Sequence, residues 1–184
     1  DVFIDIGANI GTYALLLASR GMKCFAFEPV KDNFDALRIN MILNKKENKI
    51  TALGFGLGER EYTTTFIFDS VNTGAAHLME SGEAGISRQV SIKAFDIVYP
   101  ELKIDENDAV LIKMDVEGME RNVLRGASDF LKRFKNILIV MEVKHAGEKE
   151  LKMELNKYGN FKYEIIDDLN IAACKTKTLS YADA

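Results

Sequence analysis

Tryptophan is absent from this 184-residue chain, and proline, cysteine and histidine each occur only twice. The two cysteines, Cys24 and Cys174, lie far apart in apolar, strand-like segments, and no CxxC motif or Cys/His cluster accompanies them. This scarcity argues against a disulfide framework and against a zinc site built on thiolates. We therefore expect both thiols to be reduced and the protein to be cytoplasmic.

The chain also lacks long apolar runs and an excess of positive charge. No run of about 18 apolar residues occurs, so no membrane span is expected. Lysine and arginine number 24 against 28 acidic residues, which gives no sign of a broad basic surface for nucleic acid or anionic lipid. No signal peptide, repeat or linker is visible. We expect a single domain over residues 1–184 that lacks an N-terminal segment, because the chain starts on a strand without methionine.

Apolar and amphipathic segments alternate along most of the chain. The pattern predicts strands at 2–7, 23–29, 48–58, 108–118, 136–144, 161–168 and 171–179. It predicts helices at 11–21, from about Asp32 to Met41, at 119–134 and at 147–159. Accessory strands are predicted at 61–70 and 89–98, around a loop at 72–88. Strands that alternate with helices require a mostly parallel sheet with right-handed crossovers, and the last two strands suit a hairpin.

The turn after the first predicted strand contains too few glycines to bind a dinucleotide. Gly7, Asn9 and Thr12 occupy the three positions at which the GxGxxG fingerprint requires glycine. No Gly-Lys-Ser/Thr follows either, so the phosphate-loop pattern is also missing. The turn is therefore not expected to hold phosphates.

Acidic residues at two strand ends favour a ligand that has a ribose but no phosphate. Asp5 could accept a hydrogen bond from an ammonium group or a bridging water, and Gly7 would let the backbone pass beneath the ligand. Glu28, just before Pro29, could accept both ribose hydroxyls. S-adenosylmethionine combines a ribose diol, a purine and an amino-acid tail. Asp5 and Glu28 could instead merely cap loops, but their order and spacing together favour cofactor binding.

A second charged segment, LIKMDVEGMERNVLRGA, covers the end of the predicted strand at 108–118. Lys113, Asp115 and Glu117 alternate there, so their side chains are expected to project from one side, near the opening turn. A purely structural alternative stays open, in which Lys113 pairs with an acid and Glu117 caps the next helix.

These segments resemble the FkbM family of S-adenosylmethionine-dependent methyltransferases. The resemblance rests on FIDIGANIGTYALLLA, AFEP, LIKMDVEGMERNVLRGA and IVMEV, in that order, and on the NTG loop at residues 72–74. It implies an α/β, class I (Rossmann-like), doubly wound fold, whose mostly parallel seven-stranded sheet has helices on both faces and an antiparallel final strand. It also implies methylation of a hydroxyl on a saccharide or secondary metabolite.

The resemblance further implies roles for particular residues. The cofactor site would comprise Asp5, Gly7, Ala8, Asn9, Gly11, Thr12, Glu28, Pro29 and Phe55. Phe55 departs from the family pattern, which often has a polar or acidic residue there, so adenine would be held by apolar contact. Asp115 and Glu117 would face the methyl-transfer site, with His145 as a third candidate base. His77 is expected to be a solvated loop residue or a lid contact.

Several alternatives remain open from sequence alone. Asp115, Glu117 and Glu142 could bind Mg²⁺, but nothing in their spacing fixes a coordination geometry, so no metal site is expected. An RNA or protein methyltransferase is the second class considered; the absence of an Asn-Pro-Pro-aromatic segment argues against methylation of base amino groups. A non-catalytic binding module is the third. We favour a small-molecule or saccharide acceptor, no nucleic acid, and a possible homodimer through an exposed apolar patch near Val2 and Phe3.

Overall fold

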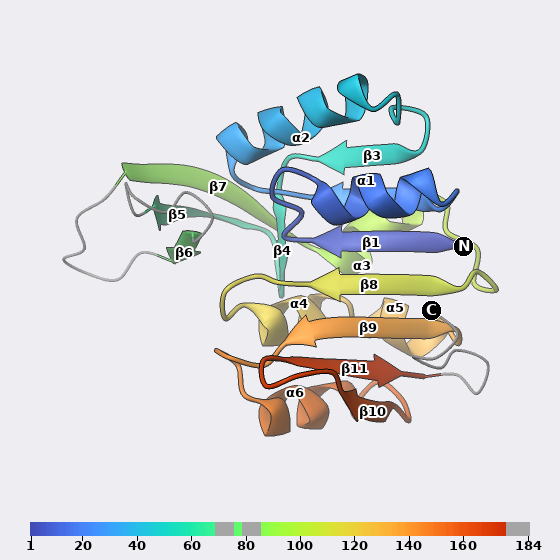
Figure 1. The fold of residues 1–184 in the computed structure, drawn as a ribbon. Helices are drawn as coiled ribbons and strands as arrows, with labels where there is room; N and C mark the ends of the chain where they lie inside the picture. Colours follow the sequence, from blue (N-terminus) through green and yellow to red (C-terminus); the bar gives the residue numbers. More distant parts are fainter. Residues whose placement is uncertain (69–75, 79–85, 176–184) are drawn as a thin grey trace.

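The computed structural model describes residues 1–68, 76–78 and 86–175 (Figure 1). Its centre is a sheet made of β1 (Val2–Ile6), β2 (Lys23–Phe27), β3 (Ile50–Leu53), β8 (Val110–Met114), β9 (Ile137–Glu142), β10 (Lys162–Ile165) and β11 (Asn170–Cys174). The seven strands are hydrogen-bonded in the order β10-β11-β9-β8-β1-β2-β3. This order confirms the predicted mostly parallel seven-stranded sheet.

The central position of β1 determines which side chains meet. β1 pairs in parallel with β2 on one side and β8 on the other, and Asp5 lies level with Lys113 of β8. β11 runs antiparallel to both β9 and β10, as predicted for the terminal hairpin and the final strand. Because parallel strands end at one edge, the carboxyl ends of β1, β2 and β8 lie together (Figure 1).

Helices cover both faces of this sheet. Phe3 belongs to a buried cluster with α1 (Thr12–Ser19) and α2 (Lys31–Leu43). Ile4 belongs to the larger cluster on the other face, which contains residues of α3 (Phe95–Val98), α4 (Glu120–Gly126), α5 (Ser128–Arg133) and α6 (Glu148–Leu155). Successive strand residues point to opposite faces, so this division follows from the pleat of β1. A short 3₁₀ helix, η1 (Tyr99–Leu102), follows α3.

Three predicted elements have different boundaries in the structure. The predicted strand at 48–58 forms β3 and a separate short strand, β4 (Gly56–Gly58), which belongs to a second sheet. The predicted strand at 89–98 ends at Ala94, and its last four residues form α3. The predicted helix at 119–134 is two helices, α4 and α5, which are separated at Ala127. The reason is the Asp96 carboxylate, which accepts hydrogen bonds from the backbone N–H groups of Asp129 (2.9 Å) and Phe130 (3.0 Å). This long-range cap gives α5 an N-terminus of its own.

The prediction of an exposed apolar patch at the start of β1 is wrong. Val2 and Phe3 are only 2% and 1% exposed, because α1 and the helices of the opposite face cover them. No dimer contact through these two side chains is therefore indicated. The two cysteines form no disulfide, in agreement with the prediction.

A second, four-stranded sheet projects from the carboxyl edge of the first (Figure 1). It consists of β4 (Gly56–Gly58), β5 (Tyr62–Phe68), β6 (Ala76–Leu78) and β7 (Ile86–Ala94), in the order β4-β7-β5-β6. β5 and β7 correspond to the predicted accessory strands. β6, which contains His77, lies within the segment that was predicted to be a loop, so that part of the prediction is wrong. The NTG motif at 72–74 lies outside the described residues. None of the helices in the described part of the chain is long and apolar enough to cross a bilayer.

Candidate active site

A cavity of about 360 Å³ opens at the carboxyl ends of β1, β2 and β8. Open α/β sheets bind ligands at this edge, where neighbouring strands lead to helices on opposite faces. The cavity brings together six of the predicted cofactor residues: Gly7, Ala8, Asn9, Thr12, Glu28 and Pro29. It is also lined by Asp115 and Glu117, two of the three predicted catalytic residues.

Four predicted residues do not line this cavity. Asp5 lies beneath its floor, fully buried, and Gly11 begins α1 behind the turn, with Leu37 packed against it. Phe55 packs edge-on against Phe27 with ring centroids 5.7 Å apart. His145 lies beside Glu117 outside the cavity wall. A role for Phe55 in holding adenine would therefore act through Phe27, which does line the cavity.

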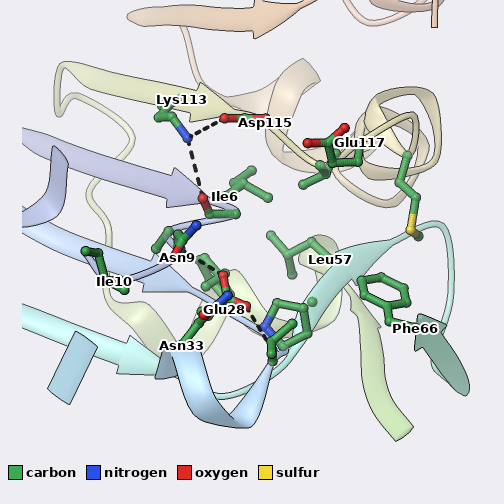
Figure 2. Close-up of a pocket in the computed structure, with 18 of the residues that line it drawn as sticks. Ile6, Asn9, Ile10, Glu28, Asn33, Leu57, Phe66, Lys113, Asp115 and Glu117 are labelled. Carbon is green, nitrogen blue, oxygen red and sulfur yellow. Dashed lines mark hydrogen bonds and ion pairs between the residues drawn. The ribbon is translucent and has the colours of Figure 1, made fainter. Parts of the chain in front are cut away.

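Glu28 holds the turn in shape. Its carboxylate follows the end of β2, is 4% exposed, and accepts hydrogen bonds from the backbone N–H groups of Asn9 (2.8 Å) and Val30 (2.9 Å; Figure 2). Burial raises the pKa of Glu28, while these hydrogen bonds oppose the shift. Each carboxylate oxygen has a further lone pair, so Glu28 can still accept from a ligand in the cavity.

Gly7, in the turn after β1, lies directly against the backbone of the segment that follows β8. Its φ is +79°, and a Cβ at this position would lie 2.0 Å from the backbone oxygen of Asp115. Any other residue would be strained and would push the turn away from the end of β8. Gly7 therefore fixes the distance between the turn and the charged segment after β8.

Asp5 and Lys113 form a partly compensated charge pair under the cavity. Within the described part of the chain, neither carboxylate oxygen of Asp5 has a hydrogen-bond partner of normal geometry, although the backbone N–H of Ala14 lies near enough to oppose the rise in the pKa of Asp5. The Lys113 Nζ lies 3.8 Å from Asp5 Oδ1 and 3.4 Å from the Gly7 carbonyl oxygen. It also lies 3.3 Å from Asp115 Oδ2 (Figure 2). Burial raises the pKa of Asp5 from 3.8 to about 6, against the opposing charge of Lys113. The site thus holds an acid with unused hydrogen-bonding capacity.

Glu117 lines the same cavity as Lys113 and Asp115, although it lies beyond the end of β8. β8 ends at Met114, and Glu117 has a left-handed backbone with φ of +48°. Its Oε2 lies 3.2 Å from His145 Nε2. One donor atom each of Glu117, Glu142 and His145 lies within 4.8 Å of the others.

The side chain of Glu142 is partly buried at the end of β9. Partial burial, followed by the negative charges of Asp115 and Glu117, raises the pKa of Glu142 above its ordinary value. Asp115 itself pairs with Lys113. The group of possible metal ligands therefore contains His145 in place of Asp115, which was considered from the sequence together with Glu117 and Glu142.

Sequence reasoning missed the apolar wall of the cavity. Phe66 of β5 and Ile92 of β7 form a buried cluster with Met119, and all three line the cavity. Figure 2 shows Phe66 and Leu57 across from Asn9. No local pattern could have found them, because they reach the site only when the second sheet folds against the first. Lys113 was noticed in the sequence, but without a role in the cofactor site.

The strand order, the antiparallel last strand and the position of the cavity define a class I, Rossmann-like methyltransferase fold. The methyltransferase FkbM domain matches residues 5–167, and the chain belongs to that family.

Three relatives illustrate the similarity. The chain is 26% identical over 151 residues to the hexuronic acid methyltransferase AglP of Haloferax volcanii, a match that covers 80% of the chain and 57% of AglP. The structure is similar to that of methyltransferase FkbM from Methylobacillus flagellatus, with a TM-score of 0.66, 20% identity, and coverage of 94% and 43% of the two chains. Streptococcus pneumoniae Sp1610 in complex with S-adenosyl-L-methionine shares the fold, with a TM-score of 0.53, 15% identity and coverage of 98% and 69%. The chain thus spans about half the length of the first two relatives.

The perturbed acid Asp5 gives a prediction for stability. Its folded-state pKa of about 6 lies above the unfolded value of 3.8, so the folded state binds the proton more tightly. Protonation of Asp5 therefore stabilises the folded state. This stabilisation is fully present below about pH 4 and is lost as the pH rises through about 6. Asp5→Asn removes the effect and should raise the free energy of unfolding at pH 7.5 by up to about 3 kcal/mol, from 1.36 kcal/mol per pKa unit.

Urea unfolding of wild type and variant at pH 4 and pH 7.5 measures this. The increase in the free energy of unfolding caused by Asp5→Asn should be smaller at pH 4. Asp168→Asn, which changes an exposed residue, should alter the free energy of unfolding little at either pH. Equal stability of Asp5→Asn and wild type at pH 7.5 would contradict the assignment.

Proposed function

We propose that this chain is an S-adenosylmethionine-dependent O-methyltransferase domain that acts on a hydroxyl group of a saccharide. The observation that carries the proposal is the set of three charged groups at neighbouring strand ends: Glu28 after β2, Asp5 in β1 and Lys113 in β8. Together they match the polar groups of this cofactor, while the turn between them lacks the glycines that a pyrophosphate requires.

Glu28 suits the ribose. Its carboxylate lines the cavity and is oriented by two backbone N–H groups, so it needs no rearrangement to accept from the two hydroxyls of a ribose. A group fixed in advance loses less conformational entropy when the ligand binds. The apolar wall that includes Leu57 and Ile92 offers contact area for the remainder of a nucleoside.

Asp5 and Lys113 suit the amino-acid tail. The tail carries an ammonium and a carboxylate. Lys113 lines the cavity, and its side chain is 18% exposed, so its ammonium is in reach of a ligand carboxylate. Asp5 lies below it with unused acceptor capacity, so it can attract the ligand ammonium through a bridging water. Family membership and the Sp1610 complex support the choice of cofactor, and AglP supports a saccharide acceptor.

Glu28, Asp5 and Lys113 would hold S-adenosylmethionine, which would supply a methyl group on a positively charged sulfur. Transfer of that methyl group to an acceptor oxygen would leave the electron pair of the broken C–S bond on sulfur. The protein has to align the reactants and remove the proton of the acceptor hydroxyl. Alignment alone can contribute roughly 7–11 kcal/mol. Asp115, half-exposed at the mouth of the cavity, is in position to accept the proton.

The assignment of Glu28 is tested by Glu28→Gln, which keeps the shape and removes the charge. A hydrogen bond to a charged group contributes about 1.5–3 kcal/mol, so affinity for S-adenosylmethionine should fall about tenfold or more. Calorimetric titration measures it, with the exposed Glu47→Gln as the matched control. Unchanged affinity in a variant whose circular dichroism melt shows a folded protein would rule out contact between Glu28 and the ribose.

The role of Asp115 is tested by Asp115→Asn. Removal of a positioned base should lower kcat roughly 10²-fold or more, while cofactor affinity changes little because ribose and tail are held by other residues. Transfer of a labelled methyl group to a panel of neutral and acidic saccharides measures turnover, with Asp168→Asn as the control. A variant that turns over at the wild-type rate would remove Asp115 from the mechanism.

A further inference from the structure

A second groove, of about 500 Å³, meets the cofactor cavity at the carboxyl edge of the sheet. It runs over β8, β9 and β11 on the side of α1, and Tyr13, Lys113 and Asp115 line both hollows. A ligand in the groove would therefore approach a ligand in the cavity at Asp115.

Three potential metal ligands converge at this junction. Glu117 lines the cavity, Glu142 lines the groove, and His145 follows the end of β9 next to Glu117. We propose that Glu117, Glu142 and His145 bind a divalent metal ion, which holds two adjacent hydroxyl groups of the acceptor. The acceptor part of this inference rests on the proposed function, whereas the metal site itself does not.

The distances are close to those of a formed site. With metal–ligand bonds of about 2.0–2.2 Å, neighbouring donor atoms lie roughly 3 Å apart and opposite ones up to about 4.4 Å. Glu117 Oε2 and His145 Nε2 are already 3.2 Å apart, and all three donor atoms lie within 4.8 Å of one another. Small side-chain rotations would close the remaining gap, since Glu117 and His145 are about one third exposed.

The types of ligand atom also fit a metal-binding site better than a chance cluster of acidic residues. The group of possible metal ligands contains a nitrogen donor as well as two carboxylates, and it comes from two separate chain segments, the loop after β8 and the end of β9. Two carboxylates and one imidazole suit ions such as Mn²⁺, and three protein ligands leave positions for other oxygen ligands.

Three carboxylates meet at the junction. Lys113 offsets the charge of Asp115, whereas Glu117 and Glu142 repel each other beside His145. An acceptor that binds through a carboxylate alone would add to this repulsion. A vicinal diol bound to a metal ion would not, so we expect the acceptor to present adjacent hydroxyls at this point.

Mn²⁺ binding, measured by electron paramagnetic resonance on the full chain, tests the site directly. Glu142→Gln and His145→Gln should each weaken Mn²⁺ binding about tenfold or more, because each removes one of three protein ligands. Glu164→Gln, an exposed carboxylate on β10, is the control and should bind Mn²⁺ as wild type does. No Mn²⁺ binding at millimolar concentration, or equal binding by Glu142→Gln and Glu164→Gln, would overturn the site.

The acceptor role needs a second measurement. Methyl transfer to a saccharide with a vicinal diol should stop with EDTA and return with Mn²⁺, whereas transfer that continues in EDTA would overturn this role. Calorimetry of S-adenosylmethionine on the same samples separates the two proposals. Cofactor binding without Mn²⁺ binding refutes the metal site alone, and Mn²⁺ binding without cofactor binding supports the site while refuting the proposed function.

Discussion

A carboxylate in the middle of a sheet is unfavourable unless a positive charge lies near it, and the Lys113 ammonium lies 3.8 Å from Asp5. The parallel register of β1 and β8 places these two residues level with each other, and the close approach of Gly7 to the Asp115 backbone holds the strand ends at that spacing. The pair is incompletely satisfied, since neither Asp5 oxygen has a hydrogen bond of normal geometry within the described part of the chain. The protein thus keeps a destabilising group at the point where a charged ligand tail would bind.

Features encoded by neighbouring residues could be predicted from sequence. The alternation of apolar and amphipathic segments was sufficient for the parallel sheet, and the order of Gly7 and Glu28 was sufficient to place them in one cavity. Features that depend on distant residues could not. The break at Ala127 depends on Asp96, more than thirty positions earlier, and Phe66 reaches the cavity only through the packing of the second sheet.

The predicted catalytic residues likewise include a feature that could be predicted from sequence and one that could not. Alternation along a strand predicted that Lys113, Asp115 and Glu117 would project together, and all three line the cavity. Beyond Met114 the chain leaves the strand, and the left-handed backbone of Glu117 directs its carboxylate to His145. A pattern of period two cannot predict a residue with positive φ, which is why the pairing of Glu117 with His145 was not foreseen.

The central claim is that the cavity between β1, β2 and β8 binds S-adenosylmethionine through Glu28 and the Asp5–Lys113 pair. A crystal structure of the chain with S-adenosylhomocysteine, the product that has lost the methyl group, tests this most directly. The account predicts both ribose hydroxyls within hydrogen-bond distance of the Glu28 carboxylate and the tail carboxylate beside Lys113. A nucleoside bound elsewhere, or a cavity that stays empty at saturating ligand, would contradict it.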